Sequence, residues 1–142
     1  MNSISKYLII LFTVIILTRC GAAYKEELVK NHYLIAVDVH QQMSIAYHTP
    51  DDRETYITLI GATIYSVGYN EEYIIAKQHP YNIYNSNKSR QTNYFILPVK
   101  KTMEWETNNG LIGPMNKLQY LSKKEELGID GLTFSKTFEH LQ

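Results

Sequence analysis

Hydrophobic and polar residues alternate along much of the chain after residue 31, a pattern typical of β-strands that bury one face. The first such run has apolar side chains at odd positions, which are Tyr33, Ile35, Val37 and Val39. In the next run the apolar positions are Met43, Ile45 and Tyr47. Polar residues 40–42 separate the two runs. We therefore predict an antiparallel hairpin that turns at these residues, with the odd positions on one apolar face.

Four further runs continue this pattern and are separated by residues that favour turns. They span residues 54–60, 63–69, 73–78 and 93–99. Gly61-Ala62 and Asn70-Glu71-Glu72 predict tight connections, whereas the Asn- and Ser-rich segment 81–92 predicts a longer loop. The last run is apolar at nearly every position, which indicates a strand covered on both faces. Because short connections favour neighbouring strands, we expect a meander of about five to six strands.

The spacing of apolar residues changes near the C-terminus. The apolar positions there are Met115, Leu118 and Leu121, at the spacing of one helical face. Pro114, after Gly113, suits the first turn of a helix, and Gly128 suits its end. We predict a helix over residues 115–127 that docks on the sheet through this apolar stripe. Strands followed by a helix define the α+β class, here an antiparallel β-meander with a C-terminal helix packed on one face.

The N-terminal segment has the features of an export signal. Lys6 precedes an apolar run of 11 residues, Tyr7–Leu17, and the only cysteine of the chain, Cys20, follows closely. A helix that crosses a bilayer needs about 20 apolar residues, whereas the apolar part of a signal peptide needs about 7–15. The length therefore indicates a cleaved signal peptide.

Two cleavage sites are compatible with this segment. Cleavage before Cys20 gives a lipoprotein, although Arg19 stands where the lipoprotein signal usually has Gly, Ala or Ser. Cleavage after Ala23 instead gives a soluble secreted protein. We favour the first, which predicts a signal peptide over residues 1–19, a lipidated Cys20 with a tether up to residue 31, and a single domain over residues 32–142.

Composition and charge exclude several partners. The chain has 14 basic and 14 acidic residues, and removal of Lys6 and Arg19 leaves 12 against 14, a net charge near −2. Without a basic patch, we expect no nucleic-acid partner. No cysteine follows Cys20, so the predicted domain has neither disulfides nor a thiolate metal site. The 12 tyrosines suit half-buried positions of a sheet.

Three stretches resemble a family of small bacterial lipoproteins that is catalogued as a domain of unknown function. The most specific stretch is residues 66–80, with the sequence SVGYNEEYIIAKQHP. Residues 93–99 resemble a later strand of that family, and residues 113–114 together with 123–129 resemble its C-terminal helix. The resemblance covers roughly residues 30–130. It implies a lipoprotein with a sheet-plus-helix fold, and it supplies no catalytic residues.

Histidines suggest one metal hypothesis. His32, His40 and His48 are spaced by eight residues, so a hairpin that turns at His40 would bring His32 opposite His48. A slip of one residue would remove this pairing, and a third ligand is missing unless Asp38 or His79 supplies it. The simpler interpretation is two histidines on the solvent face, and we predict no metal and no cofactor.

Four other residues are candidates for binding. Lys77, Gln78 and His79 lie at the end of an apolar strand, where functional groups often occur beside loops; strand alternation predicts Lys77 and His79 on the same side. Trp105 lies in a polar connection, where it is either a recognition residue or a cover for the edge of the core.

No hydrolase, phosphate-binding or metalloprotease motif is present in the sequence. We therefore predict a non-enzymatic binding or adaptor module of the cell envelope, held by its lipid at a membrane, with the outer membrane as the expected one. Its partner would be another envelope protein or a small ligand. An immunity or inhibitor lipoprotein that blocks a toxin is the alternative, and an enzyme is the third hypothesis.

Overall fold

The computed structural model describes residues 22–51, 55–81, 91–100 and 110–142. Within these residues the chain forms nine strands in two antiparallel sheets and one α-helix. The predicted α+β class, with antiparallel strands followed by a C-terminal helix, is therefore confirmed. Within the described part of the chain, no helix has both the length and the apolar composition needed to cross a bilayer.

The first sheet is a four-stranded meander in the order β1-β2-β3-β4. Its strands are β1 (Tyr24–Val29), β2 (His32–Ala36), β3 (Ser44–His48) and β4 (Tyr56–Ile60). A short 3-10 helix, η1 (His40–Gln42), forms the predicted turn between β2 and β3. The tether predicted up to residue 31 is wrong for residues 24–29, because these residues form β1. Lys25 and Glu27 lie on the exposed face of β1, so the segment looks like a polar tether in the sequence. Leu28 and Val29 at its end are buried in the core.

The second sheet has the order β8-β7-β6-β5-β9. Its strands are β5 (Ile64–Tyr69), β6 (Tyr73–Gln78), β7 (Asn93–Pro98), β8 (Ile112–Met115) and β9 (Lys136–Thr137). Strands β5 to β8 follow one another as a meander, and β9 returns to pair with the free edge of β5. The helix α2 (Lys117–Glu126) lies between β8 and β9 in sequence, and a 3-10 turn, η2 (Glu139–Leu141), follows β9.

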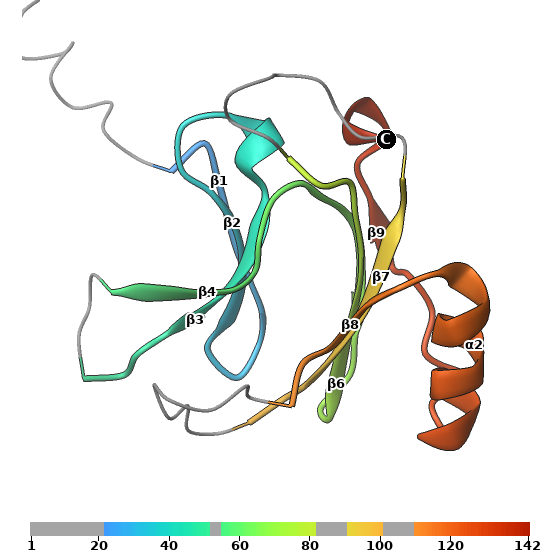
Figure 1. The fold of residues 1–142 in the computed structure, drawn as a ribbon. Coiled ribbons are helices and arrows are strands. Elements are labelled where there is room, and N and C mark those ends of the chain that lie inside the picture. The colour runs from blue at the N-terminus through green and yellow to red at the C-terminus, as the bar shows by residue number, and fades with distance from the viewer. Residues whose placement is uncertain (1–21, 52–54, 82–90, 101–109) are drawn as a thin grey trace, which may run out of the picture.

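The main core lies between the two sheets. Leu34, Met43 and Ile45 of the first part of the chain pack in one cluster with Val67 and Leu97 of the second sheet. A smaller cluster lies on the other face of the second sheet, where α2 covers it (Figure 1), and contains Ile75, Ile96, Tyr120 and Ile129. Both faces of β6 and β7 are therefore buried, which explains why these strands are apolar at nearly every position.

The buried face of β2 is the even-numbered one. Leu34 and Ala36 are fully buried, whereas Val37 is 61% exposed. Val37 and Val39 lie beyond the end of β2, so the predicted apolar face of odd positions does not form in the first run. It does form in the second run, where Met43, Ile45 and Tyr47 are buried. Tyr33 instead lies on the outer face, where its ring packs edge-on against Tyr56 at 5.5 Å between centroids. Because both faces of this strand carry apolar rings or chains, alternation alone could not identify the inner one.

The helix begins later than predicted. Gly113 and Pro114 lie in β8, and Asn116 is the N-cap of α2. The Asn116 side chain accepts a hydrogen bond from Gln119 N at 2.9 Å, and Gln119 Oε1 accepts one from Asn116 N at 2.9 Å, which completes a capping box. Gly128 ends the helix as predicted, with φ of +66°, in a conformation that favours glycine.

The helix also docks through a different face. Tyr120 and Lys124 are its buried residues, whereas Leu118 is 79% exposed and Leu121 is 48% exposed. The predicted docking stripe is therefore wrong. Lys124 can be buried because its ammonium group donates hydrogen bonds to the backbone oxygens of Asp130 at 3.0 Å and Leu132 at 2.6 Å. A lysine with satisfied donors packs its aliphatic stem like an apolar residue.

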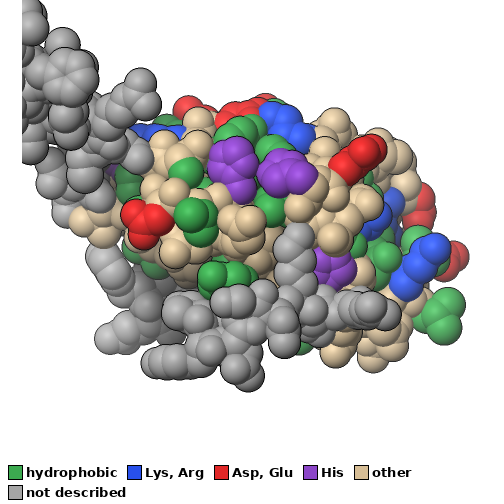
Figure 2. Space-filling view, turned by 90° about the horizontal axis from the view of Figure 1, so that it is seen from above, with side chains coloured by type: hydrophobic (Ala, Val, Ile, Leu, Met, Phe, Trp, Pro, Cys, Tyr) green, Lys and Arg blue, Asp and Glu red, His purple; other side chains and the backbone are tan. Residues whose placement is uncertain are grey.

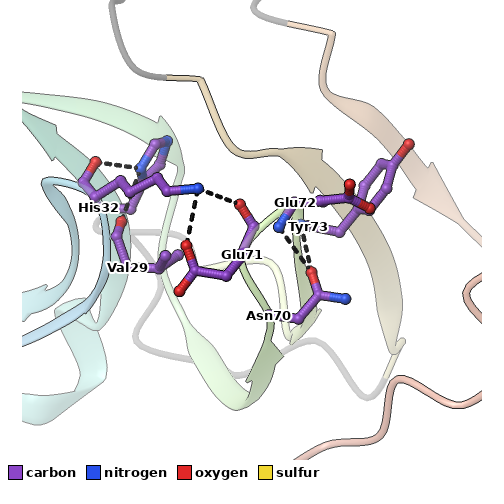
Figure 3. Close-up of polar contacts among 7 residues, drawn as sticks. Val29, His32, Asn70, Glu71, Glu72 and Tyr73 are labelled. Atoms are coloured by element: carbon purple, nitrogen blue, oxygen red, sulfur yellow. Dashed lines mark hydrogen bonds and ion pairs between the residues drawn. The ribbon is translucent and has the colours of Figure 1, made fainter.

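An ion pair joins the two sheets at one end of the core. Lys30, in the turn between β1 and β2, donates to the backbone oxygen of Glu71 at 2.8 Å and pairs with its carboxylate at 2.9 Å (Figure 3). The Glu71 turn is itself fixed by Asn70, whose side-chain oxygen accepts from the backbone N–H groups of Glu72 and Tyr73. Two hairpins from different sheets are thus linked by one lysine.

Candidate ligand-binding site

A pocket of about 240 Å³ opens on the helix side of the second sheet. It lies between strands β6 and β7, the helix α2 and the segment that leads into β9. Its lining residues are Lys77, Tyr94, Lys117, Tyr120, Leu121, Lys124, Leu132, Thr133 and Phe134. Three lysines and three aromatic rings thus share one small cavity.

Regular secondary structure positions most of these side chains. Lys77 of β6 and Tyr94 of β7 are cross-strand partners, so their side chains leave the sheet on the same face. Lys117, Tyr120 and Lys124 are three and four residues apart on α2, which places them along one side of the helix. The pocket is therefore formed where one helix face meets one pair of neighbouring strands.

The third wall depends on a glycine in β5. The segment with Thr133 and Phe134 crosses so close to β5 that a Cβ atom on Gly68 would lie 2.0 Å from the backbone oxygen of Thr133. Ser135 N then donates to Val67 O at 3.0 Å, which holds the segment on the strand edge. Only glycine permits this approach, and it brings the Phe134 ring into the pocket wall.

The charge of the pocket is positive. Lys77 Nζ lies 4.5 Å from the centroid of the Phe134 ring and 6.0 Å from that of Tyr94. None of the three pocket lysines forms an ion pair with another described residue. No carboxylate is among the described residues that line the pocket. The described residues around the pocket therefore leave these ammonium groups without a neutralising charge.

Tyr120 contributes a buried hydroxyl. The residue is 3% exposed, and its hydroxyl oxygen has no hydrogen-bond partner among the described residues. Its ring stacks on Tyr94 with 4.8 Å between centroids. Burial, with a smaller contribution from Tyr94, raises the pKa of Tyr120 to about 12. The hydroxyl therefore stays protonated at neutral pH.

The predicted cluster of Lys77, Gln78 and His79 does not form one site. Gln78 links the bend after β4 to the start of β7. Its Nε2 donates a hydrogen bond to Gly61 O at 2.9 Å, and its Oε1 accepts one from Asn93 Nδ2 at 3.2 Å. His79 stacks on Tyr65 at 4.4 Å, and Tyr65 belongs to the core between the sheets. Lys77 faces the helix side instead, so the prediction that Lys77 and His79 share a side is wrong. β6 ends at Gln78, and strand alternation ends with it.

Two of the predicted site residues lie in parts of the chain that the structure does not describe, and several residues of the pocket come from positions that the sequence did not single out. Trp105 and Cys20 lie outside the described residues. Lys117, Tyr94, Tyr120 and Phe134 were not predicted as site residues. The spacing of Lys117, Tyr120 and Lys124 could have indicated a shared helix face, but the larger apolar stripe on the same helix was the stronger signal.

The histidine hypothesis fails on strand register. His32 pairs with Tyr47, one residue away from the predicted partner His48. The His32 ring is buried, and its Nδ1 lies 2.9 Å from Lys30 O and 3.1 Å from Val29 O (Figure 3). Burial lowers the pKa of His32, against the opposing effect of these two backbone oxygens. In the described part of the chain, no three His, Cys, Asp or Glu side chains lie close enough together to hold a metal ion.

The third histidine of that hypothesis has a different neighbour. His40 Nδ1 lies 3.3 Å from His140 Nε2, so η1 and η2 meet through their imidazoles. Figure 2, which views the molecule from this end, shows histidine side chains at the surface. This contact joins the first sheet to the C-terminal segment.

The described residues thus form a domain of two antiparallel sheets that has a pocket on the helix side of its second sheet. Over residues 29–138 the chain matches the family described as protein of unknown function (DUF3997), and it belongs to that family. The matched range includes every residue that lines the pocket. No curated protein and no solved structure matched the chain.

Proposed function

We propose that this protein is a non-enzymatic binding module of the cell envelope that holds a small ligand in the helix-side pocket. The pocket itself carries the proposal, because it combines aromatic walls with polar groups that are free to interact. Its described lining contains no histidine, cysteine or carboxylate, which are the usual groups for acid–base or nucleophilic catalysis. Lysine and tyrosine donors beside aromatic rings are suited to recognition.

We also propose that Cys20 carries the lipid that anchors the module. The 11-residue apolar run before Cys20 supports this, as does the family resemblance of residues 66–80. Only residues 21–23 separate Cys20 from the start of β1 at Tyr24. Since an extended residue spans at most about 3.6 Å, a lipid on Cys20 would hold the domain within about 15 Å of the membrane surface.

Replacing Cys20 with serine tests the anchor. We expect Cys20→Ser to move the protein from the membrane fraction to the soluble fraction, or to leave an uncleaved precursor, because the acyl chains that hold it are lost. Mass spectrometry of the wild-type N-terminus gives the independent control. A mature chain that begins at Tyr24 without lipid would overturn the proposed anchor.

A panel of single-ring compounds tests the binding function. Each compound would be added to the full-length protein in detergent micelles, and binding would be measured by ligand-observed and protein-observed NMR. We expect saturable shifts at pocket residues such as Phe134 and Tyr94, and none at Leu118 on the outward face of α2. If no compound shifts the pocket resonances, the binding function is wrong. If a bound compound is chemically converted, the non-enzymatic assignment is wrong.

A further inference from the structure

We infer that the pocket selects small anions with one flat ring, of the aromatic carboxylate class. The inference rests on the proposed binding function and assigns the ligand chemistry of the same site. Lys77 and Lys117 would meet the carboxylate, and the rings of Tyr94, Tyr120 and Phe134 would meet the ring of the ligand. The positive charge of the pocket, its aromatic walls and its size support this ligand class.

The charge favours an anion over a neutral or cationic ligand. Lys77 Nζ makes no hydrogen bond or ion pair with any described residue, and neither does Lys117 Nζ. Lys124 is already satisfied in part, because it donates to two backbone oxygens. The three positive charges around the cavity repel one another, and a bound carboxylate would offset that repulsion because it attracts each of them. No described lining residue offers a negative charge to a cation.

Tyr120 contributes an aromatic surface to the pocket. The residue lines the pocket, and its ring stacks on the Tyr94 ring with 4.8 Å between centroids. Its hydroxyl oxygen is buried and has no partner among the described residues. Two stacked rings form a flat apolar wall, and such a wall suits a planar ring in the ligand.

The size and the walls of the pocket limit the rest of the ligand. Its volume of about 240 Å³ lies below the range of about 300–1,000 Å³ that is usual for drug-sized ligands. One ring with one carboxylate suits this space better than a larger molecule. Lys77 Nζ lies above the Phe134 ring at 4.5 Å, so cation and aromatic wall are adjacent. A ligand with a ring next to its anionic group matches this arrangement.

Three compounds of nearly equal shape provide the test: benzoate, benzamide and benzamidine, which are anionic, neutral and cationic. Dissociation constants would be measured by NMR titration of the full-length protein in micelles, with acetate as the anion that lacks a ring. We expect benzoate to bind about tenfold more tightly than benzamide, because one charged hydrogen bond has about that effect. Benzamidine and acetate should bind more weakly than both.

Variants of single lysines test whether benzoate binds in this pocket. We expect Lys77→Gln and Lys117→Gln each to weaken benzoate about three- to tenfold. Lys123→Gln should leave benzoate affinity unchanged, because Lys123 lies outside the pocket and pairs with Glu126. Equal affinity for benzoate and benzamide, or preference for benzamidine, would overturn the anion selectivity but leave the binding function intact. If no ring compound binds, both proposals fail.

Discussion

Replacing Ile96 with alanine is expected to lower the free energy of unfolding by about 2–5 kcal/mol. Ile96 is fully buried at the centre of β7, where it pairs with Ile75 of β6 and Ile112 of β8. Its side chain packs in the cluster that contains Tyr120 of α2. Truncation would leave a cavity below the helix, and the loss is a large part of the roughly 5–15 kcal/mol that stabilises a domain.

Chemical denaturation of the variant and the wild type measures this loss. Leu118→Ala is the matched control, because Leu118 is a large apolar residue of α2 that is 79% exposed. We expect this control to change the free energy of unfolding by no more than about 0.5 kcal/mol. If Ile96→Ala is as mild as Leu118→Ala, the helix does not cover the sheet as described.

Replacing Gly68 with alanine is expected to destabilise the domain by about 1–3 kcal/mol and to disturb the pocket. The new Cβ atom would lie 2.0 Å from the backbone oxygen of Thr133 and 2.9 Å from its carbonyl carbon. Backbone atoms cannot rotate away as a flexible side chain can, so the segment with Thr133 and Phe134 must move. Phe134 would then leave its place in the pocket wall, and β9 would lose its alignment with β5.

Thermal unfolding and ligand titration together measure this prediction. Gly131→Ala is the control on the same C-terminal segment, because nothing lies within 4 Å of a Cβ atom at Gly131. We expect Gly131→Ala to retain the wild-type thermal midpoint and ligand affinity. An unchanged midpoint in Gly68→Ala would show that the segment does not cross β5 at this distance.

Local sequence signals were sufficient to predict β6 and β7, the two neighbouring strands inside the second sheet. β6 has the predicted bounds of residues 73–78, because Asn70 fixes the turn before it and Pro80 follows it. β7 lies within the predicted range 93–99. These segments are marked by turn residues and by apolar side chains on both faces, and both signals are contained in neighbouring residues.

The division into two sheets could not be predicted in the same way. The bend at Gly61-Ala62 was predicted, but its effect, which is to carry the chain from one sheet to the other, depends on packing across the core. β9 has only two residues, Lys136 and Thr137, and its pairing with β5 depends on residues far away in sequence. A strand of this length has no periodicity of its own.

The pocket escaped prediction because its residues come from separate parts of the chain. Lys77, Tyr94 and Phe134 meet only after β6, β7 and the C-terminal segment have assembled. The helix adds a second difficulty, because Lys124 is buried and Leu118 is exposed. Lys124 can be buried because the backbone oxygens of residues 130 and 132 accept its hydrogen bonds. These acceptors lie outside α2, so the residue pattern of the helix could not predict them.

The pairing of β9 with β5 has a consequence for how the chain reaches its folded state. The two strands join Ser66 to Thr137 across 71 positions of the chain, so the edge of β5 stays open until residues 136 and 137 are available. An uncovered edge is a template for pairing with another chain, and contacts this distant in sequence form late. We therefore expect the C-terminal segment to close this edge and to limit self-association of the newly made protein, and we expect a chain cut before residue 132 to lack that protection.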